Sequence, residues 1–411
     1  MVLPDIHNYD RRYESQKRRL TESDVSQRNK QLILEFDRQA VMEQLSLPRR
    51  IKLMNSLYNL ATVYLKKDFD QATKEDIKQV MLEIESRQDY SPWTKVSYRA
   101  VLKKFYKWLV FGDEYRDKLE YPPIVSWIRT NMKKKDQPKV QASDILTEEE
   151  VARLIRASEH PRDKAFIAIT YELGARIGEV GKLQVKSITK DKYSYLVDVN
   201  GKTGQRTPRI VFSAPYITAW LNEHPHKDDL EAPLWVLAGR REKVRARYGS
   251  LRAMVLRLAK AAKIQKRMYP HLFRHTRVTH VLINRLMSEA QAKVYFGWAP
   301  SSRMLADYQH LVSRDVNDTI LVMYGIRKDE ETEKVLQPKQ CSMCQTINSS
   351  DAMFCQKCAQ VLDLKAAIAL DEKRKQYDER IASFLKDKDA QVFFAKKARE
   401  LGLWEKLKQT A

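Results

Sequence analysis

Apolar residues recur three and four positions apart along most of this chain, and this spacing is the strongest constraint on its fold. Leu53, Leu57 and Leu60, for example, share one face if their segment is helical. The period changes between residues 192 and 212, where KYSYLVDV and RIVF have β propensity. Between them lies GKTGQRTP, whose glycines suit a tight turn, so we predict a hairpin there. The predicted fold is mainly α-helical with a small β-sheet.

Breaks in this pattern divide the chain into segments. The polar, lysine-rich run from Lys133 to Ser143 is typical of a linker. The sequence Thr147-Glu-Glu-Glu150 after it predicts the start of a helix. We therefore predict a flexible N-terminus at residues 1–22, a helical domain at 23–132, a linker at 133–146, a mixed α/β domain at 147–330, a cysteine-containing module at 338–362 and a helical tail at 363–411.

The charge of the chain restricts its partners. Its 411 residues include 75 Lys and Arg against 53 Asp and Glu, a formal net charge of +22. Residues 240–277 carry 13 Lys or Arg and one Glu, more than half of that excess. This distribution favours nucleic acid over an anionic membrane, although a basic run can also be a solvated helix face. The same two interpretations apply to a stripe of basic residues spaced four apart, Lys95, Arg99, Lys103 and Lys107.

Neither a membrane nor a secretory signal is indicated. No apolar run approaches the roughly 20 residues that a membrane-spanning helix needs. The first 20 residues carry charges where a signal peptide would be apolar. We therefore expect a cytoplasmic protein.

The four cysteines form one pattern, C-x2-C-x10-C-x2-C, and they are Cys341, Cys344, Cys355 and Cys358. Two such pairs can present four thiolates tetrahedrally to one ion, and Zn²⁺ is the usual occupant in a reducing compartment. Four thiolates leave no open coordination position, so the zinc is predicted to be structural. Disulfides are the alternative, which the lack of an export signal disfavours.

Residues suited to phosphate chemistry occur in five short motifs. These are GARIGEV with Arg176, GKT with Lys202, HLFRHT with His271 and Arg274, GW with Trp298, and YQH with Tyr308. Each motif alone has an ordinary explanation. Arg176 could pair with Glu179, and His271 with Arg274 could be a surface pair. Lys202 could be an ordinary turn lysine, and Tyr308 could be one more of 19 tyrosines.

In this order, and with these intervening elements, the motifs resemble those of the tyrosine recombinase and integrase family. Members of that family cut and rejoin DNA through a phosphotyrosine linkage. The resemblance covers about residues 147–325 as the α/β catalytic domain and about 23–132 as the helical, SAM-like core-binding domain. The cysteine module, predicted to be a zinc ribbon, and the tail lie outside it. Such zinc-ribbon appendages are similar to those of archaeal proteins.

The resemblance implies a role for each residue. Arg176 and Arg274 are the two catalytic arginines, and His271 belongs to the His-x-x-Arg pair. Lys202 is the hairpin lysine, Trp298 fills a position that the family gives to His or Trp, and Tyr308 is the nucleophile. Trp298 and Tyr308 lie ten positions apart, where nine is commonest in the family, which implies a local bulge. Tyr295 and Tyr324 are the alternative phenols.

These residue types suit attack on a phosphodiester. The attack places negative charge on two non-bridging oxygens, and two guanidinium groups can fork across them in place of a metal ion. His271 and the indole N–H of Trp298 would donate hydrogen bonds, and His271 would help Tyr308 to lose its proton. Lys202 would protonate the departing 5′ oxygen as a general acid.

We therefore predict a site-specific DNA recombinase or integrase that acts on double-stranded DNA through a 3′-phosphotyrosine intermediate. It would form a tetramer on synapsed sites, associate with the nucleoid, and need neither a nucleotide nor a catalytic metal. One alternative is an enzyme like type IB topoisomerases, which nicks and closes DNA without exchanging strands. Another is a DNA-binding regulator with a decayed pocket.

Overall fold

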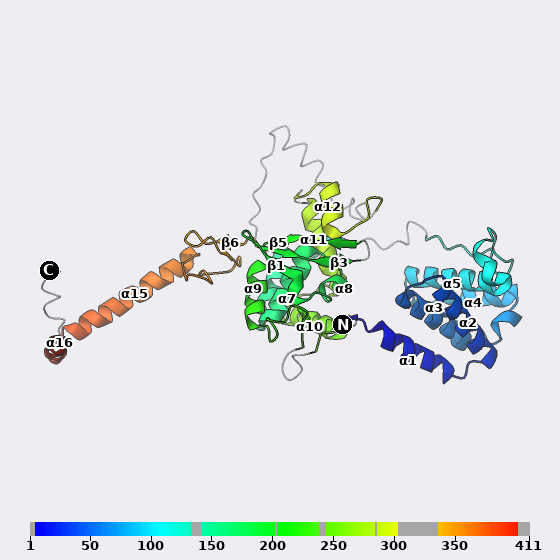
Figure 1. Ribbon diagram of the computed structural model, residues 1–411, viewed down its shortest axis with the longest axis horizontal. Coiled ribbons are helices and arrows are strands. Elements are labelled where there is room, and N and C mark those ends of the chain that lie inside the picture. The colour runs from blue at the N-terminus through cyan, green and yellow to red at the C-terminus, as the bar shows by residue number, and fades with distance from the viewer. Residues whose placement is uncertain are drawn as a thin grey trace, which may run out of the picture. The chain divides into compact units, whose positions relative to one another are not determined.

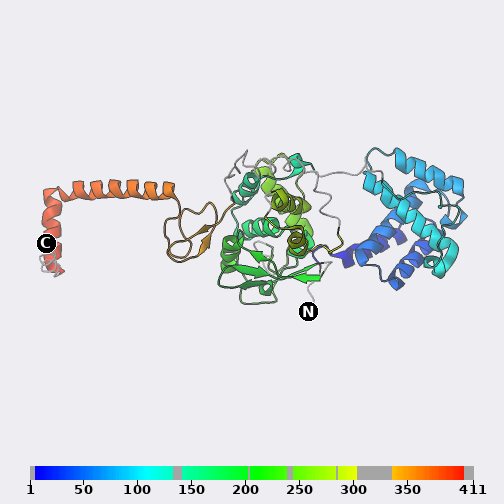
Figure 2. The ribbon, with the colours of Figure 1, turned by 90° about the horizontal axis from the view of Figure 1, so that it is seen from above.

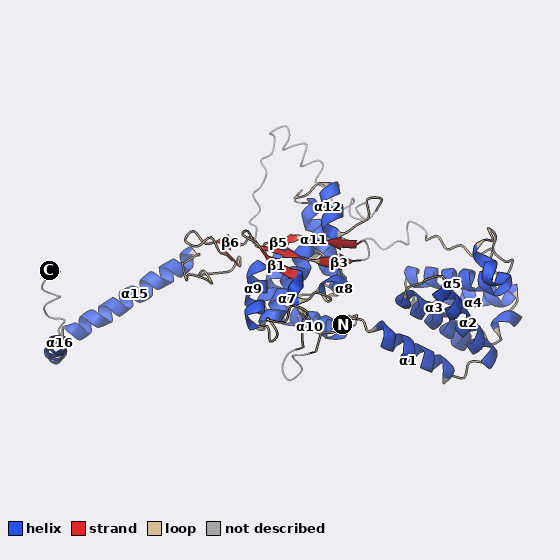
Figure 3. Cartoon of the chain, viewed as in Figure 1, coloured by secondary structure: helices blue, strands red, loops and turns tan. Residues whose placement is uncertain are grey.

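The computed structural model describes residues 5–132, 141–201, 204–237, 244–283, 286–302 and 336–401. They fall into two compact units. One consists mainly of residues up to Asp144, and the other mainly of residues from Ile145 onward. Figures 1 and 3 show that helices dominate and strands are few, so the predicted fold class is confirmed.

The first unit is helical and has its own core. Phe105 packs edge-on against Phe36 and Phe69, with ring centroids 5.2 Å and 4.9 Å apart. Burying several aromatic rings around one point stabilises such a small bundle. The helices are α1 (Tyr9–Thr21), α2 (Gln27–Met42), α3 (Leu47–Asn59), α4 (Lys74–Ser86) and α5 (Pro92–Phe111), with a π-helical turn at Leu60–Tyr64 and 3-10 turns at Phe69–Gln71 and Gly112–Arg116.

The N-terminus corrects a prediction. Residues 1–22 were expected to be flexible because they are so polar, but Tyr9–Thr21 form helix α1. Leu20 is fully buried in the core of the first unit. The hydroxyl of Tyr13 donates to Asp37 at 2.6 Å, and Asp37 also pairs with Arg50. Two side chains of α1 are therefore enough to anchor it, because Leu20 gains burial and Tyr13 joins a half-buried ion pair.

The second unit combines helices with short strands. In Figure 2 the green strands lie along one side of the green helices. Its elements are α6 (Glu148–Arg156), α7 (Pro161–Leu173), α8 (Ile177–Val180), β1 (Ile188–Lys190), β2 (Tyr195–Val197), β3 (Val199–Gly201), β4 (Gly204–Arg206), β5 (Arg209–Ile210), α9 (Ala214–Glu223), α10 (Tyr248–Ala261), α11 (Pro270–Ile283), α12 (Glu289–Phe296), β6 (Lys339–Gln340), β7 (Ile347–Asn348), α15 (Leu364–Leu385) and α16 (Lys388–Glu400).

The predicted hairpin is present, but it is divided between two sheets. Strand β2 pairs with β1 and β5 in one antiparallel sheet, while β3 pairs with β4 in another. The division falls at Asp198, whose amide donates to Ser187 and whose carboxylate accepts from Thr207. These bonds turn the chain out of the first sheet. The pair β3–β4 ends at Gly201 opposite Gly204, so the sequence places Lys202 in the connection between them.

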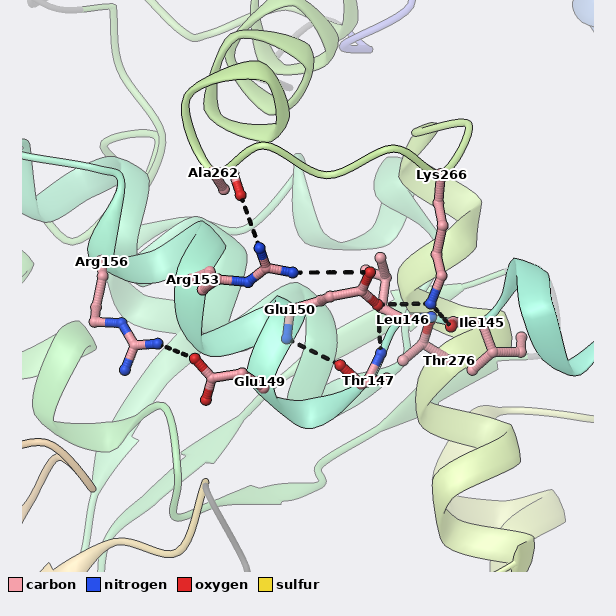
Figure 4. Close-up of polar contacts among 10 residues, drawn as sticks. All are labelled: Ile145, Leu146, Thr147, Glu149, Glu150, Arg153, Arg156, Ala262, Lys266 and Thr276. Atoms are coloured by element: carbon pink, nitrogen blue, oxygen red, sulfur yellow. Dashed lines mark hydrogen bonds and ion pairs between the residues drawn. The ribbon is translucent and has the colours of Figure 1, made fainter.

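Helix α6 is tied to α11 through a set of polar contacts (Figure 4). Thr147 and Glu150 form the predicted capping box at the start of α6. Lys266 donates to the Glu150 carboxylate and to the carbonyl of Ile145, both at 2.6 Å. The amide of Leu146 donates to the hydroxyl of Thr276 on α11 at 3.3 Å. The start of α6 is therefore tied to the helix that carries the His-x-x-Arg motif and to the segment before it.

The C-terminal helices expose much apolar surface. Ile381 and Phe384 on α15 and Val392 and Phe393 on α16 are all exposed. Within the described ranges, no helix is both long enough and apolar enough to cross a membrane.

Candidate active site

Arg176 lies at the N-terminus of α8, where a sharp turn follows α7. Gly174 ends α7 with φ 52°, in the left-handed region. A Cβ at Gly174 would stand 2.7 Å from the Phe296 ring, so both conformation and space require glycine there. The guanidinium of Arg176 donates from Nη1 to Glu179 at 2.8 Å, yet its side chain is 37% exposed. One edge of the group is thus held by protein while part of it faces solvent.

Glu179 is buried between two arginines. Its Oε1 accepts from Arg176 and its Oε2 from Arg206, each at 2.8 Å. Burial alone would raise the pKa of the Glu179 carboxyl, but the hydrogen bonds and charges of Arg206 and Arg176 together lower it. Glu179 is therefore ionised at neutral pH and orients Arg176.

Arg274 ties the other motifs to the first. It is 1% exposed on α11, and its Nη1 donates to the Gly174 carbonyl at 2.9 Å. Its Nη2 donates to the Phe296 carbonyl at 2.9 Å, and its guanidinium lies 5.2 Å from the centre of the Trp298 ring. Two of its hydrogen bonds thus end two residues before Arg176 and two residues before Trp298. These contacts bring three of the predicted residues together.

His271 lies one turn before Arg274 on the same helix. Its ring meets the ring of His275 edge-on, with centroids 4.8 Å apart. The residue keeps an exposed edge, while nearby protein atoms exclude water from much of the ring. That desolvation, together with the charges of His275, Arg274 and Arg176, lowers the pKa of His271 to about 4. His271 is therefore neutral at pH 7.

Trp298 follows the end of α12, where Gly297 has φ 63° and turns the chain. Its amide donates to the Lys293 carbonyl at 2.8 Å, and its ring packs 5.3 Å from that of Phe296. The side chain is 7% exposed. Its indole N–H is buried and has no hydrogen-bond partner among the described residues. A buried donor left in this way is one that a ligand oxygen would satisfy.

Two predicted residues, Lys202 and Tyr308, lie outside the described residues, and so does the alternative phenol Tyr324. The other alternative, Tyr295, is held within the protein. Its hydroxyl donates to the Glu172 carbonyl at 3.0 Å, and burial raises its pKa. A phenol in that state is a poor nucleophile, so Tyr308 and Tyr324 remain as the candidates.

Comparison with known proteins finds similarity to one family. The model of the phage integrase family matches residues 144–314, the stretch that contains all six predicted catalytic residues. The chain is 24% identical over 225 residues to the tyrosine recombinase XerA of Pyrococcus horikoshii, covering 54% of this chain and 72% of XerA. It is 26% identical over 121 residues to XerC of Shewanella sp. (strain ANA-3), covering 29% and 40%.

The match to the phage integrase family covers residues 144–314, and the relatives are tyrosine recombinases. The predicted tyrosine recombinase resemblance is thus confirmed, although the XerC match spans only 40% of that relative's length.

The integrase fold is also found among solved structures. A lambda integrase dimer bound to a COC′ core site superposes with a TM-score of 0.52 at 14% identity, covering 68% of this chain and 76% of that chain. A lambda integrase tetramer bound to a Holliday junction gives a TM-score of 0.50 at 12% identity, covering 66% of this chain and 78% of that chain. At these identities the shared feature is the fold.

Other residues of the integrase domain hold the site together, and the sequence analysis missed them. Glu172 is buried and accepts from the amides of Val211, Phe212 and Ser213 at 2.7 to 3.0 Å, which joins α7 to the chain after β5. Arg206 joins β4 to Glu179. A lone acid or arginine carries no local signal of such a role, because its partners are distant in sequence.

The basic segment next to the integrase motifs is largely exposed. Lys266 is engaged with Glu150, but six basic residues on and around α10 are exposed, namely Arg247, Arg252, Arg257, Lys260, Lys263 and Arg267. Of these, Arg257 also pairs with buried Asp163 at 2.9 Å. This arrangement fits a surface for a polyanion.

The basic stripe on α5 is different. Arg99 pairs with Glu85 at 2.7 Å, and Lys95 donates to the Glu85 carbonyl. Lys103 and Lys107 lie over the ring of Tyr121 at 3.9 Å and 5.1 Å. All four side chains have intramolecular contacts, which favours the interpretation of this stripe as an ordinary protein surface.

The four cysteines form a candidate metal centre outside the integrase domain. Their sulfur atoms all lie within 4.8 Å of one another, and no disulfide joins them. The Cys341–Cys358 and Cys344–Cys355 sulfur pairs are 3.5 Å apart. Tetrahedral Zn–S bonds of about 2.3 Å would put neighbouring sulfurs about 3.8 Å apart. The cluster therefore fits a metal ion, such as zinc, that is bound by four thiolates, as predicted.

Proposed function

We propose that this protein is a site-specific DNA recombinase or integrase that cleaves and rejoins DNA through a 3′-phosphotyrosine linkage to Tyr308. The observation that carries the proposal is the convergence around Arg274, which contacts the turn before Arg176 and the ring of Trp298 and lies one turn from His271. The match to the phage integrase family supports the same reaction.

The two arginines would compensate the charge of the transition state. As phosphorus becomes five-coordinate, charge gathers on the non-bridging oxygens, and guanidinium groups in fixed positions offset it without reorganising. Arg274 is held at two carbonyls and Arg176 at Glu179, so both are pre-oriented. The unpartnered indole N–H of Trp298 supports a further hydrogen bond to the phosphate.

Proton transfer would be divided between His271 and Lys202. Tyr308 has to lose a proton as it attacks, and we assign the acceptance of that proton to His271. The departing 5′ oxygen needs a proton, which we assign to Lys202 in the connection between β3 and β4. The phosphotyrosine retains the energy of the phosphodiester, so a 5′-hydroxyl from another strand can reverse the attack. The reaction would need no ATP.

The partner would be double-stranded DNA. Four copies of this protein would bind two synapsed DNA sites as a tetramer. The complex would form in the cytoplasm, at the nucleoid. The exposed basic residues around α10 support contact with DNA backbones. The lambda integrase tetramer bound to a Holliday junction, which has the same fold, supports the oligomer.

Zinc would be held by Cys341, Cys344, Cys355 and Cys358 and would be structural. Four thiolates saturate the ion, and the short strands β6 and β7 have little core to support them.

The decisive experiment replaces the nucleophile. Tyr308→Phe should abolish the covalent protein–DNA adduct on a nicked suicide substrate while a gel shift still shows binding. Tyr295→Phe serves as the matched control and should retain the adduct. An adduct that survives in Tyr308→Phe would refute the assignment. Relaxation of supercoils by the wild type without strand exchange would instead identify a topoisomerase-like enzyme, and binding without any adduct a regulator.

A further inference from the structure

Arg206 is the last residue of β4 and its guanidinium is almost entirely enclosed. The side chain is 9% exposed. Its Nη2 donates to Glu179 Oε2 at 2.8 Å, and its Nε donates to the carbonyl oxygen of Tyr295 at 3.0 Å. One side chain thus joins the β3–β4 pair to two other segments of the site.

The remaining nitrogen, Nη1, lies where two glycines let the backbone approach it. A Cβ built on Gly297 would stand 2.6 Å from Nη1. A Cβ on Gly201 would stand 3.4 Å from Nη1 and 2.6 Å from Glu179 Oε1. Nη1 is buried and has no hydrogen-bond partner among the described residues. The guanidinium therefore fills a slot between the hairpin and the turn at Gly297. A Cβ at Gly297 would displace the guanidinium, and a Cβ at Gly201 would displace the Glu179 carboxylate that it binds.

The three segments that meet at Arg206 each adjoin a residue of the proposed mechanism. Glu179 orients Arg176. The Tyr295 carbonyl lies in the last turn of α12, before Trp298. Gly201, at the end of β3, directly precedes Lys202. Arg274 links the first two of these segments, because it donates to the carbonyls of Gly174 and Phe296.

The hairpin needs such an anchor because it is short. Strands β3 and β4 have three residues each, and an isolated two-stranded hairpin is marginally stable in water. A general acid has to come within hydrogen-bond reach, roughly 2.6 to 3.2 Å, of the oxygen that it protonates. A hairpin that moved freely would hold its lysine within that range for little of the time.

We propose that Arg206 is a positioning residue that anchors the β3–β4 hairpin against Glu179 and the end of α12, and thereby places Lys202 at the leaving oxygen. This inference rests on the proposed function. Arg206 acts through the lysine and does not itself touch the reacting atoms.

The test compares two leaving groups on suicide substrates. One carries the ordinary 5′ oxygen at the scissile bond and the other a bridging 5′ sulfur. A thiol with a pKa of about 8.5 leaves as thiolate, so the second substrate needs no general acid. Single-turnover cleavage is measured for wild type, Arg206→Met and Arg206→Lys, with Arg176→Met as the comparison for lost charge compensation. Arg209→Met is the matched control, because Arg209 is a nearby arginine on β5 that pairs with Asp191.

Arg206→Met should cleave the oxygen substrate about 100-fold or more slowly, the usual scale of general acid catalysis. On the sulfur substrate it should come within a few-fold of wild type, whereas Arg176→Met stays slow on both. Arg209→Met should behave as wild type. Added to Lys202→Ala, Arg206→Met should cause no further loss. Arg206→Lys keeps the charge but lacks the planar guanidinium, so its cleavage rate on the oxygen substrate should lie between those of the wild type and Arg206→Met. If a thermal melt shows that Arg206→Met is unfolded, Arg206→Lys replaces it in the comparison.

Unimpaired cleavage by Arg206→Met, or an equal loss on both substrates while DNA binding persists, would overturn the inference. A wild type that forms no adduct on either substrate would defeat the proposed function itself, and the two failures are thereby distinct.

Discussion

At the scale of single residues, the surroundings of each titratable group decide its charge. Glu179 is buried yet ionised, because two guanidinium groups face its two oxygens. His271 is neutral, because it is desolvated and has cationic neighbours. The same helix thus carries a positive charge at Arg274 and a neutral imidazole one turn before it.

His280 gives a measurable consequence of such desolvation. Its Nδ1 lies 2.9 Å from the Tyr171 hydroxyl, and burial lowers its pKa from 6.5 to about 4. Between these pH values the unfolded chain binds a proton that the folded chain does not. Stability is therefore retained above pH 6.5 and falls as the pH drops toward 4.

We expect His280→Gln to reduce this acid sensitivity by on the order of 3 kcal/mol at most. The measurement is the free energy of unfolding by urea at pH 7, 6, 5 and 4. Tyr171→Phe is the control, since it keeps the buried imidazole and should keep the slope. A slope unchanged by His280→Gln would show that this imidazole does not titrate as described.

At the scale of elements, side-chain caps start helices in both units. Capping boxes open α4 at Thr73, α6 at Thr147 and α12 at Ser288. Each satisfies amides that no helical carbonyl reaches. The box at α6 does more, because Glu150 also binds Lys266 in the segment before α11.

Thr147→Ala should weaken α6 by about 1 kcal/mol, since it removes the oxygen that accepts from the Glu150 amide. Amide hydrogen exchange in α6 is the measurement, and faster exchange is expected there. Thr147→Ser keeps the oxygen and should weaken α6 by only a few tenths of that free energy, so its exchange should stay close to that of the wild type. Equal protection in the alanine and serine variants would mean that the hydroxyl adds nothing to the helix.

At the scale of the whole molecule, the chain combines modules with different sources of stability. The first unit and the integrase domain bury apolar side chains. The module at 338–362 has four cysteines and two strands of two residues each. Cys341 and Cys355 are buried, while Cys358 is exposed. Such a module depends on its ion more than on a core.

Elemental analysis should find about one zinc per chain. Removal of the metal with a chelator should abolish hydrogen-exchange protection in residues 341–358 and leave α7 and α11 protected. Cys344→Ser should reproduce the loss, whereas Ser342→Ala, in the same knuckle, should not. A reduced, zinc-free protein that kept this protection would contradict the four-thiolate centre.

The sequence alone determined those features that depend on near neighbours in the chain. Helical spacing, the capping box at Thr147, the turn glycines and the two C-x2-C pairs are all local patterns, and the family motifs are read from residue order. The predicted flexible N-terminus failed because the anchor of α1 is remote: Leu20 enters a core and Tyr13 bonds to Asp37.

Only the tertiary structure decided which groups meet. Arg274 donates a hydrogen bond to Gly174, which lies 100 positions away in the sequence. Arg206 donates one to Tyr295, which lies 89 positions away. Hydrogen bonds and charge interactions act over a few ångströms whatever the separation along the chain, so the partners of Arg206 and the low pKa of His271 depend on the folded arrangement.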